Sequence, residues 1–271
     1  MTTLTIAAAQ FAPVDDPATN LETVRAAAAD AVACGARLLV TPEYTSFFTP
    51  DIDDRFVAAA QPLDGPFVTG LRRIARSTGI ALVVGVAEAG ETPERFRNTL
   101  VAIDASGAVL TSYRKVHLYD AFGSRESDRI EAGDPDQLPV VVVDGVRVGL
   151  ETCYDLRFPE VTRRLAAAED GAADVVLVPA EWVRGPGKEH HWRTLLTARA
   201  IENTVWVLGV GQAPPIGIGG SVAVDPSGTA VAALGADPGL LVTTVDTTTT
   251  DRVRSVNPSL ALRRYGITRR A

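Results

Sequence analysis

The sequence predicts an α/β protein with a mixed β-sheet, or two stacked sheets, covered by helices. Apolar strands that alternate with helical segments stand beside pairs of strands joined by short turns such as Asp144-Gly145. Strand–helix units favour parallel strands and hairpins require antiparallel ones, so we do not expect an all-parallel sheet. The chain has 271 residues, of which 46% are hydrophobic, and this is ample for a large core.

Four helices are expected from helical patterns and from stop signals. Asn20 is a candidate N-cap for the first helix, which is rich in alanine and ends before Gly35. Cys34 stands at the end of this helix among alanines, so we expect it to be a small core residue. The expected helices span residues 20–33, 66–77, 160 to about 169, and 190–203.

Twelve strands are expected from short apolar runs bounded by Gly, Pro, Asp or Asn. Two of them end alike: LLVTPEY at 38–44 resembles VLVPAEW at 176–182, since each continues into a carboxylate and an aromatic residue. This echo suggests two related halves. The strands span residues 4–9, 37–41, 80–87, 98–103, 108–114, 138–143, 146–150, 174–178, 205–210, 221–224, 229–234 and 240–245.

Composition restricts the class of protein. No linker divides the chain, so residues 1–271 are expected to form a single domain, with an arginine-rich tail at 246–271 that is irregular or briefly helical. The longest apolar runs are shorter than the roughly 18 residues of a membrane span, and the N-terminus lacks a signal-peptide pattern. The net charge of −7 argues against nucleic-acid binding. Two cysteines and three histidines predict a cytoplasmic protein without disulfides and without a metal site.

Cys153 is the first candidate for chemistry. The apolar strand at 146–150 leads directly to it, and a turn and a helix follow. Reactive groups of open α/β sheets lie at this end of the strands, and backbone N–H groups after the thiol would favour a thiolate or an oxyanion. An inert buried thiol is the open alternative.

Glu43 and Lys115 also follow strands. If the strands of Glu43 and Cys153 are neighbours, the carboxylate and the thiol would meet at one edge, where the carboxylate could act as a base. A solvated or capping role for Glu43 stays open. Only two of the 26 basic residues are lysine, Lys115 and Lys188, and this scarcity favours a need for an ammonium at Lys115. That one or two lysines simply persist without such a need is the open alternative.

Histidines are alternative bases for a cysteine nucleophile. His117, His190 and His191 are the three available, but none follows an apolar strand as directly as Glu43 does. His191 with Trp192 is better explained as capping and packing the helix that follows.

Several motifs together resemble the nitrilase, or carbon–nitrogen hydrolase, superfamily. They run in order through most of the chain, and this resemblance implies a four-layer αββα sandwich and a Glu–Lys–Cys triad without a cofactor. The matching segments are 42–43 (PE), 113–118 (YRKVHL), 153–160 (CYDLRFPE), 179–182 (PAEW), 191–192 (HW), 198–203 (ARAIEN), 220–221 (GS) and 225–228 (DPSG).

The resemblance assigns roles to these residues. Glu43 would be the general base, Lys115 the ammonium that stabilises the oxyanion, and Cys153 the nucleophile. Glu126 matches a second glutamate that orients the lysine and the substrate. The N–H of Tyr154 would be the second oxyanion donor.

The sequence after the cysteine distinguishes between branches of the superfamily. Tyr154-Asp155 is similar to the amidase branches, and 157–160 (RFPE) resembles the ω-amidase and deaminated glutathione amidase group. This similarity implies hydrolysis of a small linear amide to an acid and ammonia. Arg157 would bind a substrate carboxylate or pair with Glu160. The 119–129 loop departs from that group, which leaves the substrate open.

The remaining expectations concern the pocket wall and the assembly. By analogy Glu181 and Trp182 line the pocket, while Arg199 and Glu202 form a structural ion pair. The tail would pack at a homodimer interface. Two other functions stay open: an N-carbamoyl amine or amino-acid hydrolase, and a catalytically silent interaction protein with the same fold.

Overall fold

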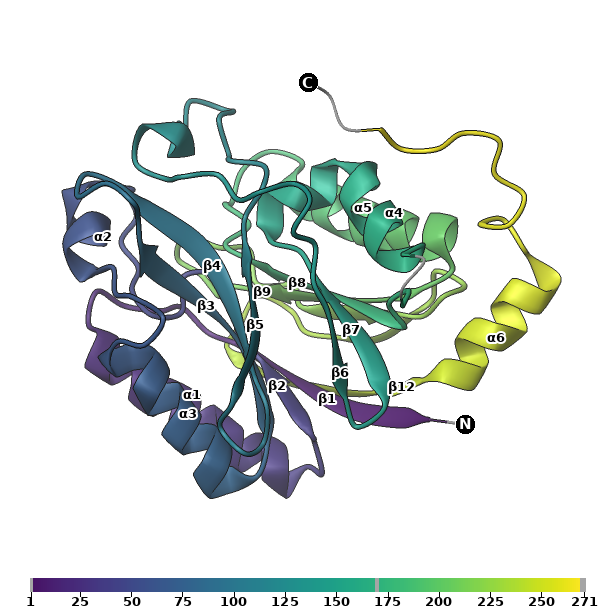
Figure 1. Ribbon diagram of the computed structural model, residues 1–271, viewed down its shortest axis with the longest axis horizontal. Helices are drawn as coiled ribbons and strands as arrows, with labels where there is room; N and C mark the ends of the chain where they lie inside the picture. The colour runs from purple at the N-terminus through teal and green to yellow at the C-terminus, as the bar shows by residue number, and fades with distance from the viewer. Residues whose placement is uncertain (1, 169–170, 269–271) are drawn as a thin grey trace.

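Two six-stranded sheets form the body of the protein, which the computed structural model describes for residues 2–168 and 171–268 (Figure 1). The first sheet has the strand order β12 (Gly239–Asp246), β1 (Thr3–Gln10), β2 (Leu38–Val40), β3 (Ala81–Ala89), β4 (Phe96–Ile103) and β5 (Val109–Arg114). The second sheet has the order β11 (Ala230–Ala233), β10 (Val222–Val224), β9 (Trp206–Gly211), β8 (Val175–Ala180), β7 (Val146–Leu150) and β6 (Val140–Val143).

Both sheets are mixed, as the sequence predicted. Strands β1, β2 and β3 are parallel to one another, and so are β7, β8 and β9. Hairpin strands pair antiparallel outside these central strands. The two strands with similar sequences, β2 and β8, each occupy the middle of a parallel trio, which supports the predicted relation between two halves.

The layers follow from the alternation of side chains along each strand. In β1, Ile6 packs in the core between the two sheets, whereas its neighbour Ala7 packs in the core under the helices. The middle core takes residues from both sheets, such as Leu38 and Val148. Burying one aliphatic side chain of this size contributes about 1.5–3 kcal/mol.

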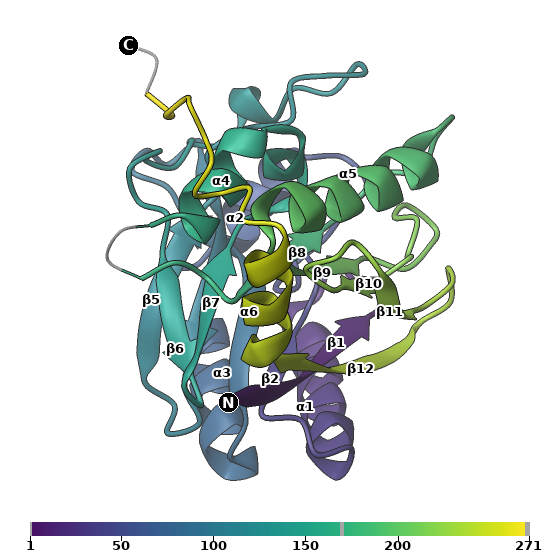
Figure 2. The ribbon, with the colours of Figure 1, turned by 90° about the vertical axis from the view of Figure 1, so that its right-hand side faces the viewer.

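Helices close the two outer faces and complete the predicted αββα sandwich. Helices α1 (Pro17–Ala33) and α3 (Pro66–Thr78) cover the first sheet, and α4 (Pro159–Ala166) and α5 (Lys188–Asn203) cover the second (Figures 1 and 2). The short helix α2 (Asp54–Ala59), which was not predicted, lies near β3. Helix α6 (Thr247–Val256) follows β12 at the end of the sandwich that faces the viewer in Figure 2.

The predicted start of the first helix is wrong. Asp16 is the N-cap, since its carboxylate accepts the N–H groups of Ala18 and Thr19, and Pro17 takes the first helical position. Asn20 is buried one turn later, where its side chain accepts the N–H of Val14 and donates to the same residue's carbonyl. Asp-Pro was the stronger start signal.

The prediction of a core position for Cys34 is also wrong. Cys34 is the C-cap of α1 and is exposed, in the turn between α1 and β2 that includes Gly35, whose φ is 78°. Helix α4 ends at Ala166, and Glu169, where the prediction ended, lies outside the described residues. Helix α5 begins two residues earlier than predicted and therefore includes Lys188.

No helix in the described part of the chain is long and apolar enough to cross a membrane.

Candidate active site

Cys153 begins a tight turn between β7 and α4. Its φ is 47°, in the left-handed region that costs a non-glycine residue about 1 kcal/mol or more. Hydrogen bonds between Thr152 and Asp155 hold this conformation: the Asp155 carboxylate accepts the N–H of Thr152 at 3.2 Å, and the N–H of Asp155 donates to the Thr152 carbonyl oxygen at 2.9 Å. The strand, turn and helix order predicted around the thiol is present.

Asp155 also ties this turn to the end of β5 in the other sheet. Its buried carboxylate accepts the Tyr113 hydroxyl at 2.7 Å and the backbone N–H of His117 at 2.9 Å. The His117 ring lies 2.8 Å from the same carboxylate and stacks on Phe158. A buried charge with this many partners is stable, and its partners fix the position of the turn.

Lys115 lies between two buried glutamates. Its Nζ donates to Glu43 Oε1 at 2.9 Å and lies 3.0 Å and 2.9 Å from the two oxygens of Glu126. Burial alone would lower the pKa of Lys115, but the attraction of Glu126 and Glu43 outweighs burial and raises this pKa well above its ordinary value. Lys115 is therefore a fixed ammonium.

Glu126 is held from three directions. Besides Lys115, its carboxylate accepts the Tyr44 hydroxyl at 2.9 Å and the N–H of Tyr119 at 2.7 Å. Burial raises its pKa, with help from Glu43 and against the attraction of Lys115. This geometry suits a residue that positions the ammonium.

Glu43 is positioned by the backbone beyond β8 as well as by Lys115. The Asn98 side chain donates to its Oε1 at 2.6 Å, and the N–H of Glu181 donates to its Oε2 at 2.6 Å. The segment that carries Glu43 packs closely on β3, where a Cβ on Gly85 would lie 2.6 Å from the carbonyl oxygen of Pro42. Glu43 is 1% exposed, so a solvated carboxylate is excluded.

The thiol also contacts the backbone of Glu181. Cys153 Sγ donates to the carbonyl oxygen of Glu181 at 3.7 Å, so this one residue bonds Cys153 through its carbonyl and Glu43 through its N–H. The two predicted strands are not neighbours: β2 and β7 belong to different sheets, and stacking of the sheets brings their ends together. Glu43 and Cys153 therefore do not meet at one edge through neighbouring strands, which is the arrangement that the sequence analysis considered.

Cys153 is a thiol, not a thiolate, in this environment. Burial raises its pKa well above the ordinary value, Glu43 raises it further, and Lys115 only partly opposes them. The predicted effect of the backbone N–H groups on the thiol is therefore outweighed. A neutral thiol requires a base to take its proton at the moment of attack.

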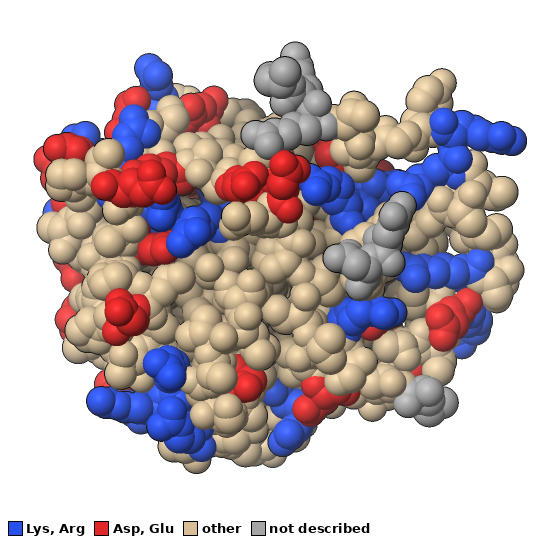
Figure 3. Space-filling view, in the orientation of Figure 1, with Lys and Arg blue, Asp and Glu red and all other residues tan. Residues whose placement is uncertain are grey.

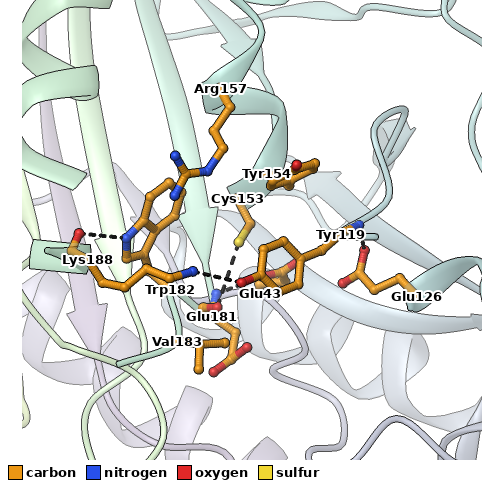
Figure 4. Close-up of a pocket in the computed structure, with 10 residues that line it drawn as sticks. All are labelled: Glu43, Tyr119, Glu126, Cys153, Tyr154, Arg157, Glu181, Trp182, Val183 and Lys188. Atoms are coloured by element: carbon orange, nitrogen blue, oxygen red, sulfur yellow. Dashed lines mark hydrogen bonds between the residues drawn. The ribbon is translucent and has the colours of Figure 1, made fainter. Parts of the chain in front are cut away.

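These groups line a pocket of about 310 Å³ (Figure 4). The side chain of Trp182 and the predicted residues Tyr154, Arg157 and Glu181 belong to its wall. Lys115 lies behind Glu43 and Glu126 and is 1% exposed. The described wall contains no histidine and consists of Glu43, Tyr119, Glu126, Cys153, Tyr154, Arg157, Glu181, Trp182, Val183 and Lys188.

The pocket wall carries cationic and acidic side chains on opposite sides. Arg157 and Lys188 lie on the opposite side of Cys153 from Glu126 (Figure 4). The guanidinium carbon of Arg157 lies 4.8 Å from the centre of the Trp182 ring, and Lys188 Nζ lies 4.3 Å from that of the Phe122 ring. A small substrate would therefore meet cations at one end and carboxylates at the other.

Arg157 has no carboxylate partner among the described residues. The predicted alternative of a pair with Glu160 is not observed, since Glu160 is exposed and two buried nitrogens of Arg157, Nε and Nη2, have no hydrogen-bond partner in the described chain. The predicted pair of Arg199 and Glu202 is present at 2.9 Å.

Sequence reasoning missed Lys188 as part of the site. It is 8% exposed, and its ammonium donates to the Tyr119 hydroxyl at 2.7 Å. Burial and the nearby Arg157 lower its pKa. The scarcity of lysine was the available signal, and it applied to Lys188 as well as to Lys115.

Trp192 packs as predicted. It is a residue of α5, its side chain is fully buried, and its Nε1 donates to the carbonyl oxygen of Gly220 at 2.9 Å. His191 lies inside the helix, whose N-cap is Gly187, so the predicted capping role of His191 is wrong.

Comparisons with known proteins find a family model and several similar proteins. Residues 5–255 match the family model described as carbon-nitrogen hydrolase. Deaminated glutathione amidase of Escherichia coli O157:H7 is 39% identical over 260 residues, which cover 96% of this chain and 97% of that protein. The deaminated glutathione amidase of Rattus norvegicus is 33% identical over 257 residues, covering 89% and 76%.

Solved structures of an amidase from Nesterenkonia sp. AN1 are also similar. A glutamate-to-glutamine mutant that carries the acetamide moiety of fluoroacetamide on its active-site cysteine superimposes with a TM-score of 0.79 at 33% identity, covering 97% of this chain and 94% of that one. Another mutant of that amidase holds butyramide, with a TM-score of 0.77 at 34% identity, covering 94% and 95%.

Proposed function

Since the chain belongs to the carbon–nitrogen hydrolase family and is an amidase, we propose that it hydrolyses a small linear carboxylic amide through a thioester on Cys153. The observation that carries this proposal is the backbone of Glu181, whose N–H donates to the Glu43 carboxylate and whose carbonyl oxygen accepts from the Cys153 thiol. Two consecutive peptide groups that flank one Cα therefore set the relative position of base and nucleophile.

In the first half of the reaction, Cys153 attacks the amide carbon and Glu43 takes the thiol proton. The sulfur–carbon bond forms as the carbonyl oxygen becomes an oxyanion, which Lys115 and the backbone N–H of Tyr154 stabilise. Glu43 then gives its proton to the amide nitrogen, the carbon–nitrogen bond breaks, and ammonia leaves (an amine, where the amide nitrogen is substituted). Loss of one such oxyanion donor typically lowers kcat by about 10²–10³.

In the second half, Glu43 takes a proton from water, and the resulting hydroxide attacks the thioester. The oxyanion forms again beside Lys115, the carbon–sulfur bond breaks, and Cys153 regains its proton from Glu43. The products are a carboxylic acid and the enzyme in its starting state. Glu126 takes no proton in this scheme and holds Lys115 in place.

The cationic end of the pocket indicates the substrate class. Arg157 and Lys188 are adjacent cations without a carboxylate partner in the described chain, and their repulsion favours binding of an anion between them. We place a carboxylate of the acyl group there, with the amide nitrogen toward Glu43 and Glu126. The similarity to deaminated glutathione amidases supports an acyl group that bears such a carboxylate.

A panel of amides tests this function. The purified protein is incubated with glutaramate (the monoamide of glutarate), with butyramide, and with an N-carbamoyl amino acid, and released ammonia, acid and carbon dioxide are measured. We expect glutaramate to be hydrolysed with the highest kcat/KM and without carbon dioxide. Preference for the N-carbamoyl substrate, with release of carbon dioxide, would support the carbamoyl hydrolase instead, and inactivity on all three would refute the proposal.

The assembly and the compartment complete the proposal. Residues 1–271 would act as one domain, and the tail at 246–271 would pack against a second copy: Val256, Leu262 and Tyr265 are 83%, 69% and 91% exposed. Basic side chains gather on the side of the molecule where this tail lies (Figures 1 and 3). We place the protein in the cytoplasm, where two free thiols, one of them the nucleophile, would stay reduced.

A further inference from the structure

The active-site pocket opens into a much larger groove of about 1810 Å³. Segments 48–53 and 122–129 form most of the groove wall. Four residues line both hollows, and so mark where they join: Tyr119, Glu126, Glu181 and Val183. In Figure 4, Tyr119 and Glu126 lie on the opposite side of Cys153 from Lys188, while Glu181 and Val183 lie on the side of Cys153 away from Arg157.

Among the four residues at this junction, Glu181 is the one whose polar side chain is not engaged in a hydrogen bond within the described chain. Glu126 is committed to Lys115, the Tyr119 hydroxyl accepts a hydrogen bond from Lys188, and the side chain of Val183 is apolar. Glu181 uses its N–H and carbonyl to hold Glu43 and Cys153. Its side chain points away from Cys153 and runs beside Val183 (Figure 4).

The Glu181 side chain is partly buried, and no cation is bonded to its carboxyl among the described residues. Its Oε1 is inaccessible and has no hydrogen-bond partner in the described part of the chain. Burial first, and then the negative charge of Glu43, raise its pKa well above the ordinary value of a glutamate, although Lys115 opposes this. A raised pKa means that this carboxyl holds its proton more tightly than a solvated glutamate does, and the protonated carboxyl offers one O–H donor.

We infer that Glu181 is a specificity-determining residue whose side-chain carboxyl donates a hydrogen bond to an acceptor on the leaving amine of an N-substituted amide. The inference rests on the proposed function, which places the acyl group at Arg157 and Lys188 and the amide nitrogen beside Glu43. A substituent on that nitrogen then passes the junction and enters the groove. Its acceptor, such as a carbonyl oxygen one carbon from the nitrogen, meets the Glu181 side chain there.

Two N-substituted glutaramates of the same shape test this inference. In one the nitrogen carries a carbamoylmethyl group, which has a carbonyl acceptor, and in the other an isobutyl group, which has none. The measured quantity is the ratio of their kcat/KM values, with glutaramate as a third substrate. Because the two share the acyl group and the shape, the ratio reports the acceptor.

We expect the wild type to favour the carbamoylmethyl amide, and Glu181→Ala to lower the ratio about five- to tenfold, the effect of one lost hydrogen bond. Glu181→Gln retains a donor and should keep the ratio within about twofold of wild type. Val183→Ala is the matched control, because it enlarges the same junction without removing a polar group and should change both rates by a similar factor.

The pH dependence separates this role from a structural one. In the wild type the ratio should fall as the pH rises through the pKa of Glu181, because the carboxylate has no proton to donate, and in Glu181→Gln the ratio should not change with pH. The inference is overturned if Glu181→Ala slows all three substrates equally, or if the wild type does not distinguish the two N-substituted amides. If the wild type hydrolyses no amide at all, the proposed function fails, and this inference fails with it.

Discussion

Glu151 → Gln should stabilise the protein, and should do so more at alkaline pH than at acidic pH. Glu151 is fully buried two residues before Cys153, and its Oε2 accepts the Thr162 hydroxyl at 2.8 Å. Its Oε1 has no hydrogen-bond partner among the described residues. Burial raises the pKa of Glu151 from the ordinary 4.5 to about 8.

Because the pKa of Glu151 is higher in the folded protein than in the unfolded chain, Glu151 makes the folded protein less stable as the pH rises. Between about pH 4.5 and about pH 8 the folded state keeps a proton that the unfolded chain has lost, so the stability falls as the pH rises. One pKa unit corresponds to about 1.4 kcal/mol, so the cost from Glu151 is about 3 kcal/mol near pH 7 and grows by about 3 kcal/mol between about pH 5 and about pH 8. Glutamine keeps the shape and does not titrate.

Urea unfolding at the two pH values measures this effect. The free energy of unfolding of Glu151→Gln should exceed that of the wild type by about 3 kcal/mol more at about pH 8 than at about pH 5. Glu160→Gln is the control, because it removes an exposed carboxylate close in sequence and should leave the pH dependence of stability as it is. An equal effect of Glu151→Gln at both pH values would refute the reasoning.

Four further substitutions probe the site. Lys115→Met should lower kcat on glutaramate by about 10²–10³ or more, since the oxyanion loses its ammonium; steady-state kinetics measure this, and a change confined to KM would contradict the role. Arg157→Met and Lys188→Met should each raise KM for glutaramate about tenfold or more, with a smaller effect on butyramide; equal effects on both amides would argue against a carboxylate site. Asp155→Asn should lower the free energy of unfolding by about 1–3 kcal/mol, because the bonds that join the Cys153 turn to β5 weaken; unchanged urea unfolding would contradict that role.

The sequence could predict the fold because the local signals were strong. Apolar strands and their turn residues identified all twelve strands to within a few residues, and the change between hairpins and βα units predicted mixed sheets. The same signals placed Glu43, Lys115 and Cys153 at strand ends. Strand ends collect reactive groups because the backbone there leaves the sheet and exposes its polar atoms.

The rest depended on contacts between distant segments. Glu43 and Cys153 meet because two sheets stack, which no local pattern encodes. Lys188 reaches the pocket from the first residue of α5, so its role depends on how that helix packs over β8 and β9. The sequence cannot predict the role of the Glu181 backbone, because this role depends on an N–H and a carbonyl that nearly every residue has.

The central claim is that an acyl group is transferred to Cys153 during hydrolysis. The most direct test is to quench the wild type with acid during turnover of glutaramate, digest it, and measure the masses of its two cysteine peptides. If hydrolysis passes through a thioester, we expect the added mass of a glutaryl group on the peptide of buried Cys153 and none on that of exposed Cys34. Continued hydrolysis by Cys153→Ala, with no acyl group on Cys153 in the wild type, would contradict it.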